Sequence, residues 1–431
     1  MSLTVIDFLK RGVATSRQIQ QATGLSQAAV SRHLNRLGSS VIKLNDKRPP
    51  QYVLSTNAFG MSNTIPLSMI DENAEVTIVG YLRPLESDGF YLETSTNTPS
   101  ALLGINHGFF SYLPYYLDDL RPQGFLGRQI AKKMSELSEY FPSKLAYWNA
   151  DQVGRYIIAN NEDLTGNVLL GEQALLNIKK PPKAVHRTEY ARIATEVLQG
   201  ETFGSSAGGE QPKFTAFNHE LQKHVIVKFS PAGDSEIAQR WRDILLTEHY
   251  ACLALNKYKI PAAITKIVEQ GDRLFLESVR FDRKGMFGKL AMISLHAIDS
   301  EFVGFADNWL QTCNQLVKLK LFNPEDLEQI KLLSAFGLLI NNTDMHLGNL
   351  SLTIDGDIFK PLPIYDMCSM GFAPKASEVM PFVFKPPKID TLGLNSNQIS
   401  VIKKVVGCFW KKLSQDKRIS TEFKWALNNK N

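Results

Sequence analysis

Long hydrophobic runs are missing from this chain. No apolar stretch approaches the roughly 18–20 residues that cross a bilayer, and residues 1–7 carry no basic segment ahead of an apolar one. We therefore expect no membrane partner and no secretory signal peptide. The expected location is the cytoplasm, with association with the nucleoid as a further option.

Cysteine is also scarce, and the four cysteines are too scattered to form a CxxC pair. Such spacing argues against a zinc site and is typical of proteins in a reducing compartment. The four lie at Cys252, Cys313, Cys368 and Cys408.

The length and charge distribution indicate more than one domain. A chain of 431 residues exceeds one ordinary core, and 44% hydrophobic with 21% charged residues is typical of globular proteins. Residues 1–54 hold eight Lys or Arg and two acids, so the net charge of this segment is +6. The net charge of the whole chain is +5, which leaves −1 for the residues after 54. This asymmetry points to nucleic acid as the partner of the N-terminal segment.

The first 56 residues have the pattern of a winged helix-turn-helix domain. Apolar spacing predicts helices over residues 3–11 (Leu3, Ile6 and Leu9 inward), from Thr15 or Ser16 onward, and over 27–37. Strands are expected at 41–44 and 51–54, with the wing between them.

The third helix would enter the major groove of double-stranded DNA, with the wing on the backbone. A small helical module for protein contacts is the alternative. The predicted DNA-binding residues are Ser26, Gln27, Ser31, Arg32, Arg36, Lys47 and Arg48.

Beyond the N-terminal domain, residues 57–74 read as a polar linker, and the pattern from Phe302 onward is mainly helical. Strands are expected at 76–82 and 90–93, and two further short strands within 154–171.

Polar residues between two apolar runs mark the candidate active site. Asp344 and Asn349 have the spacing of a protein-kinase catalytic loop, where an Asp handles the substrate hydroxyl and an Asn holds magnesium. Asp366 follows a short strand, where a second metal ligand would stand. Each of them alone also fits a residue that closes a turn or caps a helix.

A glycine-rich loop and a lysine on a strand add a candidate nucleotide site. Residues 204–217 could lay backbone N–H groups against phosphates, although the loop also fits a flexible surface segment. Lys228 interrupts an apolar strand, which favours an anionic partner such as Glu248 on the next helix. The alternative is that Lys228 snorkels at a strand edge.

Five motifs in order resemble the HipA family of bacterial toxin serine/threonine kinases. They are Leu120-Arg121-Pro122-Gln123-Gly124, the loop from Ser206 to Lys213, the segment from Glu277 to Arg283, the loop from Asn342 to Asn349, and Tyr365-Asp366. The resemblance covers residues from about 75 to 415. It implies an α+β fold in which the winged helix precedes a two-lobed, protein-kinase-like body. In this body residues 75–180 would form an N-terminal subdomain, and residues 181–431 the kinase core with a mainly helical C-terminal lobe.

The resemblance also implies roles for individual residues. Asp344 would be catalytic, and Asn349 and Asp366 would hold Mg²⁺. Ser206 would be the autophosphorylated residue, with Ser205 as a competitor. The implied ATP contacts are Ala207, Gly208, Gly209, Glu210, Gln211, Lys213, Lys228, Glu277 and His346.

Two features depart from the family pattern: Ala207 stands where the family usually has Ile, and the winged helix is fused to the kinase instead of lying on a separate antitoxin. The implied function is a growth-inhibiting toxin that phosphorylates a housekeeping protein, with ATP and Mg²⁺ as cofactors and an antitoxin protein as an optional partner. The alternative is a DNA-directed effector: a nucleotide-responsive repressor, or a nuclease using the same metal site.

Overall fold

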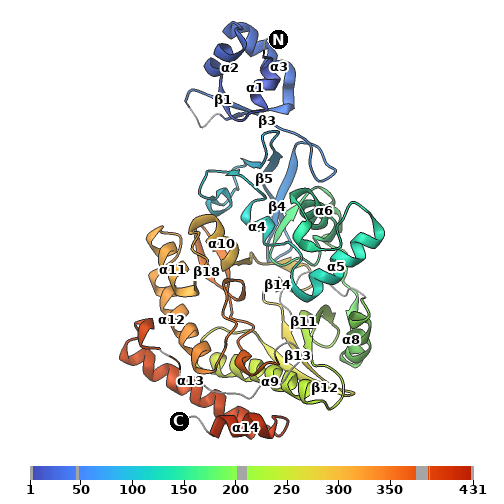
Figure 1. Cartoon of the computed structure of the whole chain (residues 1–431), viewed down its shortest axis with the longest axis vertical. Coiled ribbons are helices and arrows are strands. Elements are labelled where there is room, and N and C mark those ends of the chain that lie inside the picture. The colour runs from blue at the N-terminus through green and yellow to red at the C-terminus, as the bar shows by residue number, and fades with distance from the viewer. Residues whose placement is uncertain (1–2, 45–47, 201–210, 375–386, 388, 429–431) are drawn as a thin grey trace.

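The computed structural model describes residues 3–44, 48–200, 211–374, 387 and 389–428. Figure 1 shows an elongated molecule, with the N-terminal domain at one end, a mixed domain in the middle and the C-terminal helices at the other end. No helix in these ranges is both long and apolar enough to span a membrane.

The N-terminal domain is the expected winged helix-turn-helix. Thr15 and Ser26 cap the second and third helices by accepting backbone N–H bonds, as predicted. One detail of the prediction was wrong: the first helix buries Val5 and Leu9, whereas Ile6 is 40% exposed. The elements are α1 (Val5–Leu9), β1 (Ala14–Thr15), α2 (Ser16–Thr23), α3 (Gln27–Leu37), β2 (Val41–Leu44) and β3 (Gln51–Leu54).

The strands of the wing pack against the middle domain. Ile42, Leu44 and Val53 form a buried cluster with Leu85. The buried Arg83 guanidinium donates to the Ser39 carbonyl at 2.6 Å, and so ties the two domains with a polar contact as well.

The middle domain is built on a sheet of strand order β7-β6-β5-β4-β8, with helices packed beside it. The strands are β4 (Ile65–Ile70), β5 (Val76–Pro84), β6 (Phe90–Thr94), β7 (Phe109–Phe110) and β8 (Val168–Leu170). The helices are α4 (Tyr115–Asp118), α5 (Gly124–Leu137), α6 (Ala150–Asn160) and α7 (Gln173–Asn177).

Two expectations for this region are corrected. The expected linker, residues 57–74, contains β4, which pairs with strands on both of its sides and is almost entirely buried. The first of the two strands expected within 154–171 is the C-terminal part of α6. Asn149 and Gln152 form a capping box that starts this helix, and its face from Val153 to Ile157 is buried.

The next unit is a second sheet, of order β12-β13-β11-β10-β9, with the long helix α9 against it. The other face of this sheet packs beneath α8, where the buried aromatic residues are Tyr190, Phe214 and Phe275. The elements are β9 (Ala184–Val185), α8 (Tyr190–Leu198), β10 (Lys213–Asn218), β11 (Lys223–Phe229), α9 (Glu236–Lys257), β12 (Thr265–Gln270) and β13 (Arg273–Val279).

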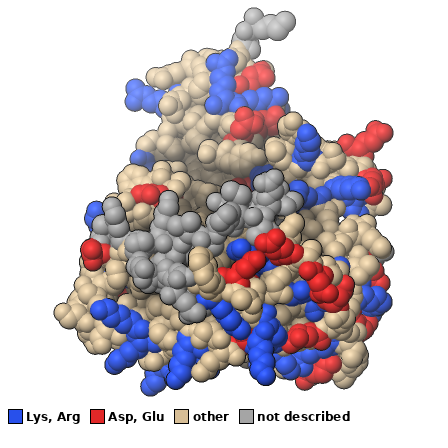
Figure 2. All heavy atoms as spheres, turned by 60° about the horizontal axis from the view of Figure 1, so that its bottom comes forward, with Lys and Arg blue, Asp and Glu red and all other residues tan. Residues whose placement is uncertain are grey.

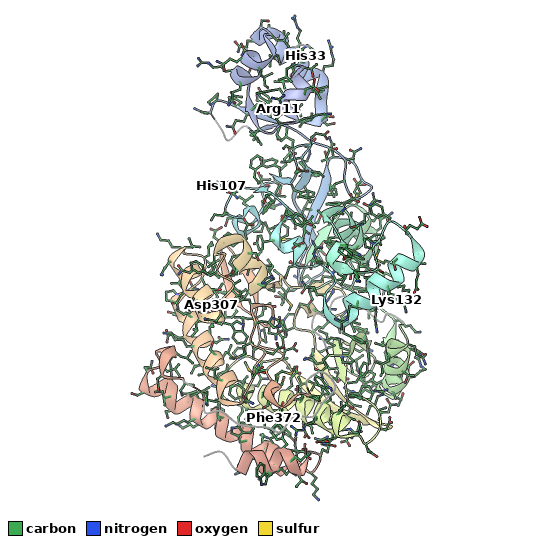
Figure 3. All side chains as sticks on the ribbon, viewed as in Figure 1. Arg11, His33, His107, Lys132, Asp307 and Phe372 are labelled. Carbon is green, nitrogen blue, oxygen red and sulfur yellow. The ribbon has the colours of Figure 1, made fainter. Side chains whose placement is uncertain are left out.

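The remaining unit is mainly helical, as predicted. Phe372 stacks on Phe423 of the last helix at 4.0 Å between ring centroids, and so anchors the C-terminal end (Figure 3). The elements are β14 (Arg283–Lys284), β15 (Gly288–Lys289), β16 (Ile293–Ser294), α10 (Leu295–Phe302), α11 (Trp309–Lys318), α12 (Pro324–Leu339), β17 (Ser351–Asp355), β18 (Ile358–Pro361), α13 (Ser396–Gln415) and α14 (Thr421–Asn428).

Candidate active site

A cavity of about 200 Å³ lies where the second sheet meets the helical lobe. The sheet and α9 contribute Lys213, Lys228 and Glu248 to its wall, and the loops after α12 and β18 contribute His346, Asn349 and Asp366. Residues from four separate sequence motifs therefore meet in one space.

Lys228 joins the two lobes across this cavity. Its ammonium donates to both Glu248 oxygens at 2.8 and 2.7 Å and also to Asp366 Oδ1. Lys228 and Glu248 are 6% and 2% exposed. The ion pair rules out the alternative in which Lys228 snorkels at a strand edge, because its ammonium is buried and paired.

Lys228, Glu248 and Asp366 shift one another's pKa values. Burial of the ammonium opposes its charge, but attraction from Asp366 and then Glu248 raises the pKa of Lys228 above its ordinary value. Burial raises the pKa of Glu248 despite Lys228. For Asp366 the attraction of Lys228 and Lys213 outweighs burial, so the pKa of Asp366 is lowered. Asp366 is thus held as a carboxylate beside two lysines.

The loop after α12 positions Asp344 and Asn349. The Asp344 N–H donates to Asn342 Oδ1 at 3.1 Å, and Asn349 Nδ2 donates to the Asp344 carbonyl at 2.7 Å. The Asp344 side chain is 51% exposed at the mouth of the site, in a hollow that it shares with His346. Asn349 is buried and faces the cavity. The loop therefore holds one carboxylate toward solvent and one amide inward.

Asp366 has an uncommon backbone conformation, with φ at +52°. A non-glycine residue in the left-handed region costs free energy and persists only where its surroundings impose it, often at functional sites. The preceding Tyr365 hydroxyl donates to the Gly348 carbonyl at 3.0 Å, which ties the Asp366 loop to the catalytic-type loop.

The donor set of Asn349 and Asp366 suits Mg²⁺. In the described ranges no group of three or more His, Cys, Asp or Glu side chains gathers to hold a metal ion. Mg²⁺ in nucleotide sites is typically held by one or two side-chain oxygens, with phosphates and water as the other ligands. One amide and one carboxylate that line the same cavity fit that requirement.

Glu277, an expected ATP contact, does not line the cavity. Its carboxylate accepts from Arg187 at 2.8 and 2.9 Å and from Tyr190 at 2.7 Å, on the opposite face of the sheet. Side chains alternate along a strand: Lys228 pairs with Leu276 in register, which turns Glu277 away from it.

The other expected ATP contacts divide in two. Lys213 and His346 line the cavity, and Gln211 is half-buried with its Nε2 lacking a partner in the part of the chain that is described. Ser205, Ser206, Ala207, Gly208, Gly209 and Glu210 lie outside the described residues.

The middle domain also contributes directly to this cavity, which the sequence did not predict. Asp119, Arg121 and Gln123 reach its wall from the end of α4. Asp119 accepts the Ser294 N–H at 2.7 Å, which fixes it to the helical lobe. The motif from Leu120 to Gly124 was the signal for this placement, since it lies in the same segment.

The second candidate site is α3, the helix predicted to bind DNA. Ser26, Gln27, Ser31, Arg32 and Arg36 are all exposed on or next to α3. Figure 3 shows His33 of α3 farther from the middle domain than Arg11, and His33 is exposed. Arg48 at the wing is exposed, whereas Lys47 lies outside the described residues.

Three parts of the chain match models of known protein families. Residues 3–40 match the family of bacterial regulatory proteins of arsR type, residues 61–179 the middle domain of YjjJ-like toxins, and residues 205–407 the HipA-like C-terminal domain. The toxin YjjJ of Escherichia coli (strain K12) is 33% identical over 427 residues, which cover 97% of this chain and 94% of that protein.

A solved structure supports the fold. The HipA, HipB and operator DNA complex of the Shewanella oneidensis MR-1 toxin–antitoxin system contains a chain with a TM-score of 0.53 and 17% identity, covering 84% of this chain and 91% of that one. Fold and cavity together define a protein with a HipA-like kinase fold and an N-terminal helix-turn-helix DNA-binding domain. Since the similarity to YjjJ extends over nearly the whole chain, the chain belongs to the YjjJ-like toxin family.

Proposed function

We propose that this protein is a Mg²⁺- and ATP-dependent serine/threonine protein kinase. The observation that carries the proposal is the buried Lys228–Glu248 ion pair beside Asp366, in a cavity that Asn349 also lines. Protein kinases use a Lys–Glu pair, an Asp and an Asn for phosphates and metal. A buried ion pair of this kind is otherwise a costly way to stabilise a fold.

The positions of the residues support a role for each of them in this proposal. Lys228 and Lys213 would bind the phosphates of ATP, and Asn349 and Asp366 would hold Mg²⁺, which neutralises charge on the phosphates when it is bound. Asp344 would orient the substrate hydroxyl and take its proton, while the hydroxyl oxygen bonds to the γ-phosphorus and the bond to ADP breaks. The exposure of Asp344 leaves room for a protein substrate.

The cellular role that fits this activity is growth inhibition in the cytoplasm by phosphorylation of a housekeeping protein. The exposed α3 residues would bind double-stranded DNA, and an antitoxin protein would be an additional partner. Self-phosphorylation at Ser206, with Ser205 less favoured, would disfavour ATP binding by adding roughly −1.5 to −2 charges near the nucleotide.

A DNA-directed effector is the second candidate function. The helix-turn-helix match and the exposed α3 residues favour it, since they supply a DNA-binding surface whether or not the cavity transfers phosphate. In that case the cavity would act as a nucleotide sensor, or its metal site would cleave DNA.

Two parallel incubations separate these functions. The purified chain is incubated with Mg²⁺ and γ-labelled ATP together with cell-extract proteins, and separately with Mg²⁺ and supercoiled plasmid. The kinase proposal predicts labelled protein and intact plasmid. Cleaved plasmid without labelled protein would support the nuclease, and ATP binding without either product would support the sensor.

A further inference from the structure

A second cavity, of about 260 Å³, lies between the middle domain and the turn end of the β10–β11 hairpin, on the same face of the sheet as Lys213 and Lys228. Part of its wall is apolar, with Leu169, Ile178, Phe217 and Phe287 among the lining side chains. None of its lining residues lines the first cavity, although Arg283 belongs to the motif from Glu277 to Arg283.

Two buried cations face this cavity. Arg283 and Lys289 are 8% and 6% exposed, and both line the wall. The Arg283 guanidinium donates to the Leu164 carbonyl at 2.6 Å, while its buried Nε has no hydrogen-bond partner in the described parts of the chain. Lys289 Nζ donates to the Asn161 carbonyl at 2.8 Å. Both cations are therefore held mainly by neutral carbonyl groups.

The nearby carboxylates are already committed to another arginine. Arg280 donates to both Asp282 oxygens at 3.0 and 2.7 Å and to Asp163 at 2.9 Å. Arg283 Nε lies 3.7 Å from Asp282, beyond hydrogen-bond distance. The buried cluster thus contains three cations and only two carboxylates, one of them partly exposed.

Burial and mutual repulsion act against both of these cations. Burial, with repulsion from Arg280, lowers the pKa of Arg283 to about 10. Burial, with repulsion from Arg283 and Arg280, lowers the pKa of Lys289 well below its ordinary value, with Asp282 and Asp163 opposing this shift. Buried cations without matched anions are rare in proteins and mark candidate binding sites.

We propose that this cavity binds a small organic phosphate. Arg283 and Lys289 would hold the phosphate group, since a guanidinium fork and an ammonium together complement a dianion. The wall has four cations, since Lys180 and Lys183 join Arg283 and Lys289, against two carboxylates, Glu162 and Asp163. The apolar side chains would hold the organic part. This inference does not depend on the kinase proposal, because the two cavities use different residues.

The test measures the thermal unfolding temperature of the full chain with increasing inorganic phosphate and, separately, phenyl phosphate. Both should raise the unfolding temperature by at least about 3 °C at saturation, and phenyl phosphate should act at a lower concentration. Lys289→Met should reduce the shift several-fold, and the part that remains would come from phosphate bound at Lys213 and Lys228 in the first cavity. Lys183→Ala, which alters only an exposed lysine of the wall, should weaken phosphate binding several-fold without threatening the fold.

The matched control is Lys284→Ala. Lys284 neighbours Arg283 but is exposed, lies 4.0 Å from Glu72, and does not line the cavity. This variant should keep the full phosphate response. The proposal would be overturned by the absence of a shift in the parent chain, or by an unchanged phosphate response in both Lys289→Met and Lys183→Ala.

Discussion

Lys228 is the residue on which the candidate active site depends most. It is the nearest cation to Glu248, and without it Glu248 and Asp366 would be neighbouring carboxylates in a buried space. Removing one partner of a buried ion pair typically costs about 3–5 kcal/mol. Lys228→Met should therefore lower the free energy of unfolding by that amount, as measured by denaturant titration.

Lys223→Met is the matched control, since Lys223 lies on the same strand but is exposed. It should change the unfolding free energy by less than about 0.5 kcal/mol. Equal unfolding free energies of the two variants would show that the Lys228 ion pair does not stabilise the fold.

Asp366 gives the site a predictable acid sensitivity. Because Lys228 and Lys213 lower its pKa, Asp366 binds its proton less readily in the folded chain than in the unfolded chain. Its stabilising contribution is present above the unfolded value of about 3.9 and is lost as the pH falls through the lower folded pKa. Unfolding measured between pH 3 and 7 should show a smaller acid loss in Asp366→Asn than in the parent; an identical pH dependence would contradict the pairing.

For single residues, the sequence motifs predicted which segments lie at the cavity better than which side chains point into it. The motif that contains Glu277 lies at the cavity, yet its neighbours Ser278 and Arg280 line the wall while Glu277 faces Arg187 and Tyr190. Direction depends on the register between β11 and β13, which spacing along one strand does not give.

Among the elements, α3 carries the DNA-binding prediction. Arg32 is exposed on this helix. If it contacts a phosphate, Arg32→Ala should weaken DNA binding about equally on all sequences and reduce the salt-dependence slope by about 1. Fluorescence anisotropy across a salt series measures both quantities.

Lys132→Ala on α5 is the control for this experiment, because Lys132 is exposed and lies far from the N-terminal domain (Figure 3). It should leave the affinity and the slope unchanged. A sequence-dependent loss with Arg32→Ala would instead indicate a base contact.

The wing strands have a second, structural role. They cover Leu85, Tyr91 and Phe109 of the middle domain. Deleting residues 1–56 should abolish DNA binding and leave nucleotide binding intact, since the cavity lies in other domains. It should also lower the unfolding temperature of the remaining body, because these apolar side chains become exposed. An unchanged unfolding temperature would mean that the packing contributes little.

The elements were predicted well where local signals were strong. The caps at Thr15 and Ser26 and the alternating wing strands placed the N-terminal domain correctly. The strand β4 was missed because Pro66 interrupts its apolar pattern and a polar segment precedes it. It is a strand because it is paired on both sides, a long-range effect that a local pattern does not contain.

Across the whole molecule, DNA-binding and kinase-type features occupy different regions. The helix-turn-helix domain lies at one end, and the cavity lies where the second sheet meets the helical lobe (Figure 1). On the face that Figure 2 shows, acidic and basic side chains are interspersed over the body. This agrees with the net charge of −1 beyond residue 54 and places the basic excess on the N-terminal domain.

The measurement that tests the central claim most directly is transfer of label from γ-labelled ATP to protein by the parent, Asp344→Asn and Asp307→Asn. Asp307 is an exposed residue before α11 and serves as the control for the same substitution. A kinase predicts labelled protein with the parent and Asp307→Asn, and a rate lower by about 10²–10⁴-fold with Asp344→Asn. Equal labelling by all three folded proteins, or none by the parent, would contradict the account.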